Sequence, residues 1–165
     1  RDIQSLPTRL SSDLYILSPD IESLRTDSTS GDKYPSPREY YACRLAEKAY
    51  RQGVYSIIYS DNEARSRLID ELLWTFRTAS FVPHELYNRP NDVEAHQLAI
   101  CNSFLPEQQN LTVINLTDRC PQALERCARV LEIVNADESS KQAGRQRYRQ
   151  YQQLGATLKT HTITI

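Results

Sequence analysis

The sequence contains no methionine and only four glycines, and its formal net charge at pH 7 is −1. The absence of methionine predicts that the numbering begins inside a longer open reading frame. None of the glycines lies in a G-x-G-x-x-G or G-x-x-x-x-G-K-S/T motif, so nucleotide binding by these loops is unsupported. A net charge near zero gives no overall basic field, and we therefore expect any association with DNA to be indirect, through another protein. Direct binding of single-stranded DNA stays open as an alternative, which a steep salt dependence would support.

The sequence also lacks a run of about 18 apolar residues and a short apolar segment near its start, which argues against a membrane span and a secretory signal. We accordingly expect a cytoplasmic location. No C-x-x-C spacing joins the cysteines and the histidines add no zinc pattern; these residues are Cys43, Cys101, Cys120, Cys127, His84, His96 and His161. The sequence therefore predicts no metal site and no cofactor, with the cysteines as buried free thiols in a reducing compartment.

Catalytic motifs are absent as well. Neither G-x-S-x-G nor H-E-x-x-H occurs. His84 with Cys43 or Cys101 is an alternative nucleophile pair, but no motif places these residues together. Asp61 and Glu63 are better explained as residues of a helix start than as catalytic carboxylates. The sequence predicts no catalytic residue, although a small hydrolase with an unrecognised site stays open as an alternative to a binding protein.

Strands and helices alternate along residues 13–165, which predicts a single α/β domain after a poorly ordered lead-in at residues 1–12. Runs rich in apolar, β-branched and aromatic residues predict the strands. They lie at 14–17, 54–59, 96–101 and 111–116, and the tail 156–165 adds an edge strand. The loop around Pro106 is expected to join two of them as an antiparallel or edge excursion. The pattern predicts a Rossmann-like three-layer fold, a mostly parallel sheet flanked by helices, without a cofactor site.

Helical spacing of apolar residues predicts three amphipathic helices. They span about 37–53, 61–76 and 137–154. Ser60 followed three residues later by Glu63 indicates a capping box at the start of the second helix. Pro121 predicts a further short helix over 121–128. Residues 130–134 either extend that helix or form a fifth strand, and their β-branched content favours the strand.

The helix at 61–76 carries the only tryptophan of the chain. Its apolar residues cover about half of the helix, and Trp74 lies about 190° from the centre of that stripe, so the indole is predicted to point away from the core. Phe81, Val82 and Pro83 follow in an apolar loop. An outward indole beside an apolar loop indicates a partner-binding patch. The alternative is that Trp74 folds back under Phe81 as ordinary packing.

The helix at 137–154 has two different sides. One side carries Lys141, Arg145, Tyr148 and Arg149. Three cations around a tyrosine could bind an acidic peptide or a terminal carboxylate, because guanidinium groups present forked donors and the ring offers a flat apolar wall. The alternative is a solvated helix face. The opposite side is predicted to pack, and it carries Ala143, Arg147, Tyr151 and Leu154.

Several motifs of the chain resemble one known family. They are A-C-R-L-A-E-K-A-Y-R-Q-G at 42–53, D-x-E-A and L-x-x-x-L-L-W within 61–74, S-F-V-P-H at 80–84, and K-x-x-x-R-x-x-Y-R at 141–149. Over residues 13–163 the chain resembles the chi subunit of bacterial DNA polymerase III. It departs from the family in a longer loop at 18–37, in the absence of a proline-valine opening near Cys101, and in Arg149 where lysine is frequent.

The resemblance implies a non-catalytic accessory subunit of the DNA polymerase III holoenzyme that binds two partners. It implies that the psi subunit, which tethers chi to the clamp loader, is bound by Trp74, Phe81, Val82 and Pro83. It further implies that the acidic C-terminal tail of the single-stranded DNA-binding protein is bound by Lys141, Arg145, Tyr148 and Arg149, with Val134 helping to accept the terminal aromatic residue of the tail.

The expected role is thus a bridge in the bacterial replisome, between the clamp loader and the protein that coats the lagging-strand template. The alternative role is an adaptor that tethers a DNA repair helicase to the single-stranded DNA-binding protein through the same tryptophan patch.

Overall fold

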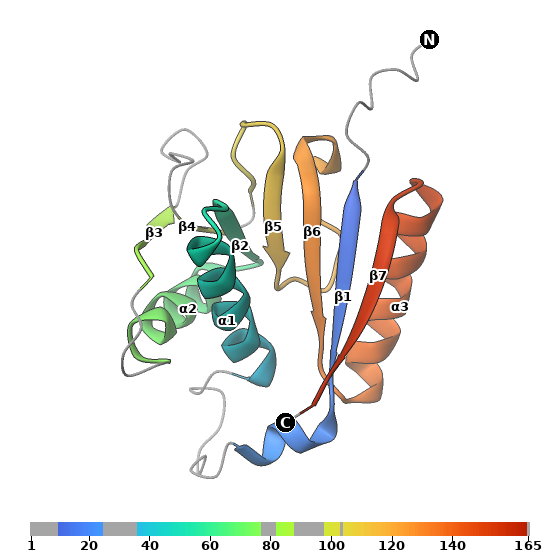
Figure 1. Cartoon of the computed structure of the whole chain (residues 1–165), viewed down its shortest axis with the longest axis horizontal. Coiled ribbons are helices and arrows are strands. Elements are labelled where there is room, and N and C mark those ends of the chain that lie inside the picture. The colour runs from blue at the N-terminus through green and yellow to red at the C-terminus, as the bar shows by residue number, and fades with distance from the viewer. Residues whose placement is uncertain (1–9, 25–35, 77–81, 88–97, 103, 165) are drawn as a thin grey trace.

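The computed structural model describes residues 10–24, 36–76, 82–87, 98–102 and 104–164 (Figure 1). In chain order the elements are β1 (Ser11–Leu17), the 3-10 helix η2 (Pro19–Leu24), α1 (Pro37–Arg51), β2 (Ser56–Ser60), α2 (Glu63–Thr75), β3 (His84–Tyr87), β4 (Leu98–Asn102), β5 (Leu111–Asn115), the 3-10 helix η4 (Leu124–Arg126), β6 (Cys127–Val134), α3 (Glu138–Gln153) and β7 (Thr157–Ile163).

The described strands form one seven-stranded sheet in the order β3-β4-β2-β5-β6-β1-β7. Every neighbouring pair is parallel. This confirms the predicted α/β fold with a parallel sheet flanked by helices. The expected antiparallel excursion around Pro106 is wrong, because β2 lies between β4 and β5 and pairs in parallel with both.

Helices cover both faces of the sheet, with α1 and α2 on one face and α3 on the other (Figure 1). Side chains of each strand alternate between two cores: Ile58 joins the core beneath α1 and α2, whereas Ile57 and Tyr59 join the core that contains Tyr151 of α3. Burial on both faces explains why the central strands are continuous apolar runs rather than alternating ones. Over the described ranges, no helix has the length and apolar character needed to cross a membrane.

The first and last strands of the structure were predicted, although β1 is longer than expected, and one edge strand was missed. β1 begins at Ser11 rather than at Leu14, and residues 1–9 of the predicted lead-in lie outside the described residues. β7 confirms the expected edge strand in the tail, where it pairs with β1. β3 was not predicted: it has four residues and pairs with β4 at the other edge of the sheet.

Two predicted helix features are wrong. The helix expected over 121–128 is only the three-residue η4, because Ala123 has a left-handed backbone with φ 59° and β6 already begins at Cys127. Residues 130–134 are accordingly the end of a strand. Helix α2 is capped by Asn62, whose Oδ1 accepts a hydrogen bond of 2.8 Å from the backbone N–H of Arg65, and not by Ser60. The Ser60 hydroxyl instead lies 2.5 Å from that of Ser66 in the core.

Candidate protein-binding faces on α2 and α3

Helix α3 packs on β6 through three buried residues, Gly144, Arg147 and Tyr151. A Cβ at position 144 would lie 2.8 Å from Cγ2 of Val134, so glycine allows the helix to approach the strand closely. Val134 is itself only 2% exposed. Leu154 was expected to face the core but is 58% exposed, because it is the cap residue just beyond the last helical residue and the chain turns away at Gly155.

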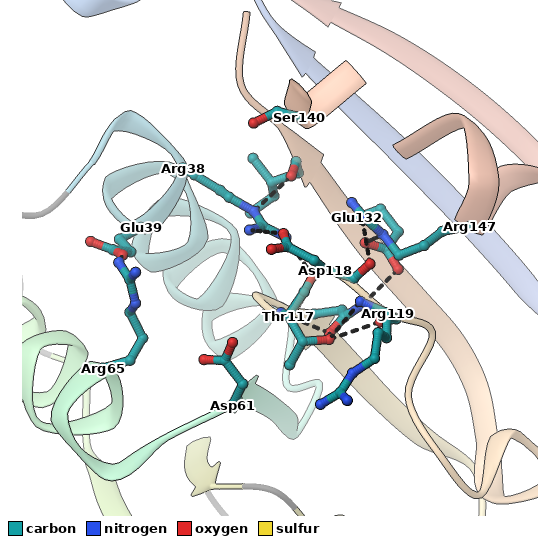
Figure 2. A network of polar contacts seen from close by, with 12 residues as sticks. Arg38, Glu39, Asp61, Arg65, Thr117, Asp118, Arg119, Glu132, Ser140 and Arg147 are labelled. Atoms are coloured by element: carbon teal, nitrogen blue, oxygen red, sulfur yellow. Dashed lines mark hydrogen bonds and ion pairs between the residues drawn. The ribbon is translucent and has the colours of Figure 1, made fainter. Parts of the chain in front are cut away.

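Beneath α3, the carboxylate of Glu132 on β6 is fully buried and receives three hydrogen bonds. Figure 2 shows Glu132 beside the first of the donors, Arg147. The donors are Nε of Arg147 at 2.8 Å, the hydroxyl of Tyr151 at 2.5 Å and Nδ2 of Asn115 at 2.8 Å. Burial raises the pKa of the Glu132 carboxyl, while the Arg147 charge and the hydrogen bonds oppose that rise. Burial and the neighbouring carboxylate also raise the pKa of Tyr151, so its phenol remains a donor. Arg147 and Tyr151 of α3 are thereby both hydrogen-bonded to one carboxylate of the sheet.

A second arginine joins the network from the opposite layer. Arg38, in the first turn of α1, donates from Nε to the carbonyl of Ile133 at 2.9 Å and from Nη2 to the carbonyl of Thr117 at 2.7 Å. Arg147 donates from Nη1 to the carbonyl of Asp118 at 3.2 Å. Helices on the two faces of the sheet are thus tied to the same short segment after β5 (Figure 2).

The sequence prediction missed this buried network. Its signals are a single glutamate inside the apolar run V-L-E-I-V and an arginine on the packing side of the last helix. A charge in an apolar strand implies a buried partner, because an unpaired buried carboxylate is costly.

The cations of α3 lie on its outer side. Arg145 and Arg149 are exposed, and Lys141 and Tyr148 are half-buried. In the part of the chain that the structure describes, none of the three cations has a carboxylate within ion-pair distance. The N-terminus of the helix is capped by Asp137, which accepts hydrogen bonds from the N–H and hydroxyl of Ser140 at 2.9 and 2.8 Å, and these bonds lower the pKa of Asp137. The stripe is therefore available to an anionic partner.

The tryptophan prediction is confirmed in its orientation. Trp74, in the last turn of α2, is 60% exposed. Its ring meets the ring of His84 edge to face, with centroids 5.4 Å apart. The His84 ring lies between two acceptors, since Nδ1 is 2.7 Å from the carbonyl of Val82 and Nε2 is 2.9 Å from Oδ1 of Asp70. Pro83 is half-buried and Phe81 lies outside the described residues. Val82 is only 1% exposed, so its side chain belongs to the core beneath the patch.

Comparison with known proteins shows the family to which the chain belongs. Residues 33–159 match the family model described as DNA polymerase III chi subunit, HolC. The chain belongs to this family. DNA polymerase III subunit chi of Pseudomonas aeruginosa is 36% identical over 129 residues, which cover 78% of this chain and 89% of that protein. The chi subunit of Haemophilus influenzae is 30% identical over 129 residues, covering 76% and 87%. Membership of the chi family supports a role in DNA replication.

Among solved structures, the chi fold of this chain is similar to that of T4 UvsW, with a TM-score of 0.62 and 10% sequence identity. The similarity covers 93% of this chain but only 41% of the UvsW chain. At that identity the likeness concerns the fold alone.

Proposed function

We propose that this chain is a non-catalytic bridge in the bacterial DNA polymerase III holoenzyme, in the cytoplasm. The outer stripe of α3 binds the acidic C-terminal tail of the single-stranded DNA-binding protein, and the Trp74 patch binds psi, through which the chain reaches the clamp loader. The observation that carries this proposal is the outer side of α3, where three cations surround a tyrosine and have no carboxylate partner among the described residues.

The geometry of α3 suits an acidic tail. Arg145 and Arg149 lie one turn apart, so their guanidinium groups can pair with successive carboxylates or with the terminal carboxylate of a peptide. Tyr148, which lies between them, offers the apolar wall for an aromatic residue of the tail. Val134 was expected to help accept this aromatic residue, but it is only 2% exposed and lies against Gly144, so its part in the proposal is to position α3.

Calorimetric titration with a peptide of the last ten or so residues of the host single-stranded DNA-binding protein tests the first face. We expect one-to-one binding that weakens as salt is added, because the contacts are between charged groups near the surface. Arg145→Ala should weaken binding by about tenfold or more, the loss typical of a charge-assisted hydrogen bond. Arg67→Ala is the matched control, since it removes an exposed arginine from α2. Equal affinity of both variants would contradict the proposed tail site.

The second face is tested with psi. An exposed aromatic anchor such as Trp74 commonly costs at least 2 kcal/mol of binding energy when it is truncated. We therefore expect Trp74→Ala to abolish co-purification with psi, whereas Tyr55→Ala, which removes another exposed ring, leaves it intact. The two faces lie on opposite layers of the sheet, so each variant should affect one partner only. Loss of both partners from either single change would refute the bridge.

A further inference from the structure

One part of the sheet, beside β1 and β7, has no covering helix among the described residues. On the side opposite α3, helix α1 lies over β2, β5 and β6, and among the described residues no α-helix lies in front of β1 and β7 (Figure 1). Strand alternation places Asp13 and Tyr15 of β1 on this side, and the parallel register places Lys159 and His161 of β7 beside them. We call this surface, between α1 and the β7 edge, the open face.

An aromatic ladder crosses the open face. The ring of Tyr15 stacks on that of His161, with centroids 4.7 Å apart and an angle of 15° between the planes. On its other side Tyr15 meets Tyr41 of α1 at 5.6 Å. The guanidinium of Arg44 lies over the Tyr41 ring, 6.0 Å from its centroid. Tyr15 is buried between its neighbours, whereas the side chain of His161 is 40% exposed, so the accessible end of the ladder is the histidine ring.

Cations surround the ladder. Arg44 and Lys48 are exposed and lie one turn apart on α1, and Lys159 is exposed on β7. Arg129 of β6 extends onto the same face, where it bonds to Asp13 with 45% of its own side chain still exposed. Asp13 is the sole carboxylate that the described strands contribute to this face, and the exposed Asp20 lies on η2, the helix that follows β1. The open face is therefore locally basic although the whole chain carries a net charge of −1.

We propose that the open face binds single-stranded DNA, with the phosphates along Arg44, Lys48, Arg129 and Lys159 and a base stacked on His161. Sites for single-stranded nucleic acid combine cations with accessible aromatic rings. The cations pair with the negatively charged phosphates, and the rings stack on the bases. A peptide with acidic side chains alone would pair with the cations but has no ring to stack on His161. This proposal differs from the expectation based on net charge, which is that contact with DNA is only indirect. The site is independent of the proposed tail and psi sites.

Fluorescence anisotropy of a fluorescein-labelled oligothymidylate, titrated with the full chain at several salt concentrations, tests this site. We expect saturable binding whose logarithmic salt slope is roughly −2 to −3, because each phosphate contact on a single strand contributes about −0.7. The double variant Arg44→Ala, Lys159→Ala should bind at least tenfold more weakly and reduce the slope by about 1.4. The control Arg67→Ala, Arg119→Ala removes two exposed charges, one on α2 and one in the segment after β5, and should change neither quantity.

The stacking contact has its own test. His161→Ala should weaken binding about fivefold, whereas His161→Phe should retain the affinity of the parent, since a phenyl ring stacks without charge. Equal losses in these two variants would overturn the stacking role. Absence of binding at low salt, equal weakening by the control pair, or competition by a polyglutamate peptide as effective as that by oligothymidylate would each overturn the proposed DNA site. Binding of the single-stranded DNA-binding protein tail should be unchanged in all open-face variants, which separates this proposal from the bridge.

Discussion

Replacement of Arg147 by methionine should destabilise the protein by roughly 3–5 kcal/mol, because it removes one partner of a buried ion pair. Methionine fills much of the same volume, so the main effect is that the fully buried Glu132 carboxylate loses its cation. Asn115 and Tyr151 still donate to it but carry no charge. A domain of ordinary stability unfolds with about 5–15 kcal/mol, so the loss would be a large share of the total. Urea unfolding followed by circular dichroism measures it directly.

The loss of stability in Arg147→Met should depend on pH in a defined direction. Burial already raises the pKa of Glu132, and removal of Arg147 should raise it further. A carboxyl group whose pKa is higher in the folded state than in the unfolded state binds more protons when folded, so stability falls as pH rises through that window. Arg147→Met should therefore cost less free energy of unfolding near pH 5 than near pH 8.

A second substitution separates the buried charge from simple loss of packing. Arg147→Met combined with Glu132→Gln removes the carboxylate as well, and should recover most of the stability and abolish the difference between the two pH values. Arg67→Met, which breaks an exposed ion pair with Glu63, should change stability by less than about 1 kcal/mol. A loss for Arg147→Met that is below about 1 kcal/mol, or equal at both pH values, would refute the reasoning.

Gly144→Ala should destabilise the protein, because the new methyl group would meet the stiff side chain of Val134, and overpacking costs about 1–3 kcal/mol. In a Val134→Ala background the same change should stabilise, since the helix preference of alanine, about 1 kcal/mol, is then unopposed; urea unfolding of the four proteins checks the change of sign. At pH 8 in the native protein, a thiol reagent such as Ellman's should react first with the half-buried Cys120, and with the other thiols only on unfolding. Those thiols, whose pKa burial raises to about 12, are Cys43, Cys101 and Cys127.

The features that the sequence predicted correctly are those encoded by local periodicity. The outward position of Trp74 follows from its angle on α2, and the separation of Arg145 from Tyr151 follows from theirs on α3. Strands β2 and β5 were found because both faces of a central parallel strand are buried, which leaves a continuous apolar run. The family motifs at 61–74, 80–84 and 141–149 suggested the partners of the two proposed binding faces, which periodicity alone describes only as exposed surface.

The errors arose where distant residues decide the local structure. β3 is a four-residue edge strand containing His84 and Glu85, and only its pairing with β4 makes it a strand. The segment at 121–128 has a helical pattern, but Cys127 pairs with Leu111 of β5 and is therefore part of the sheet. Glu132 signalled a buried partner, yet the sequence offers many arginines, and only the packing of α3 selects Arg147.

The buried network bears on how α3 could bind a tail. Parallel α/β folds often bind ligands at the carboxyl ends of their strands, where backbone and polar groups converge. At the ends of β5 and β6, the described polar groups bond to one another instead: Arg38 from one layer and Arg147 from the other both donate to carbonyls at 117–118. The inner side of α3 is thereby fixed to the sheet through Glu132. A partner that binds the outer side of a fixed helix loses little free energy in ordering it, since only the ends of the long cationic side chains must be immobilised. Replacement of Glu132 should therefore weaken tail binding even though it contacts no part of the tail.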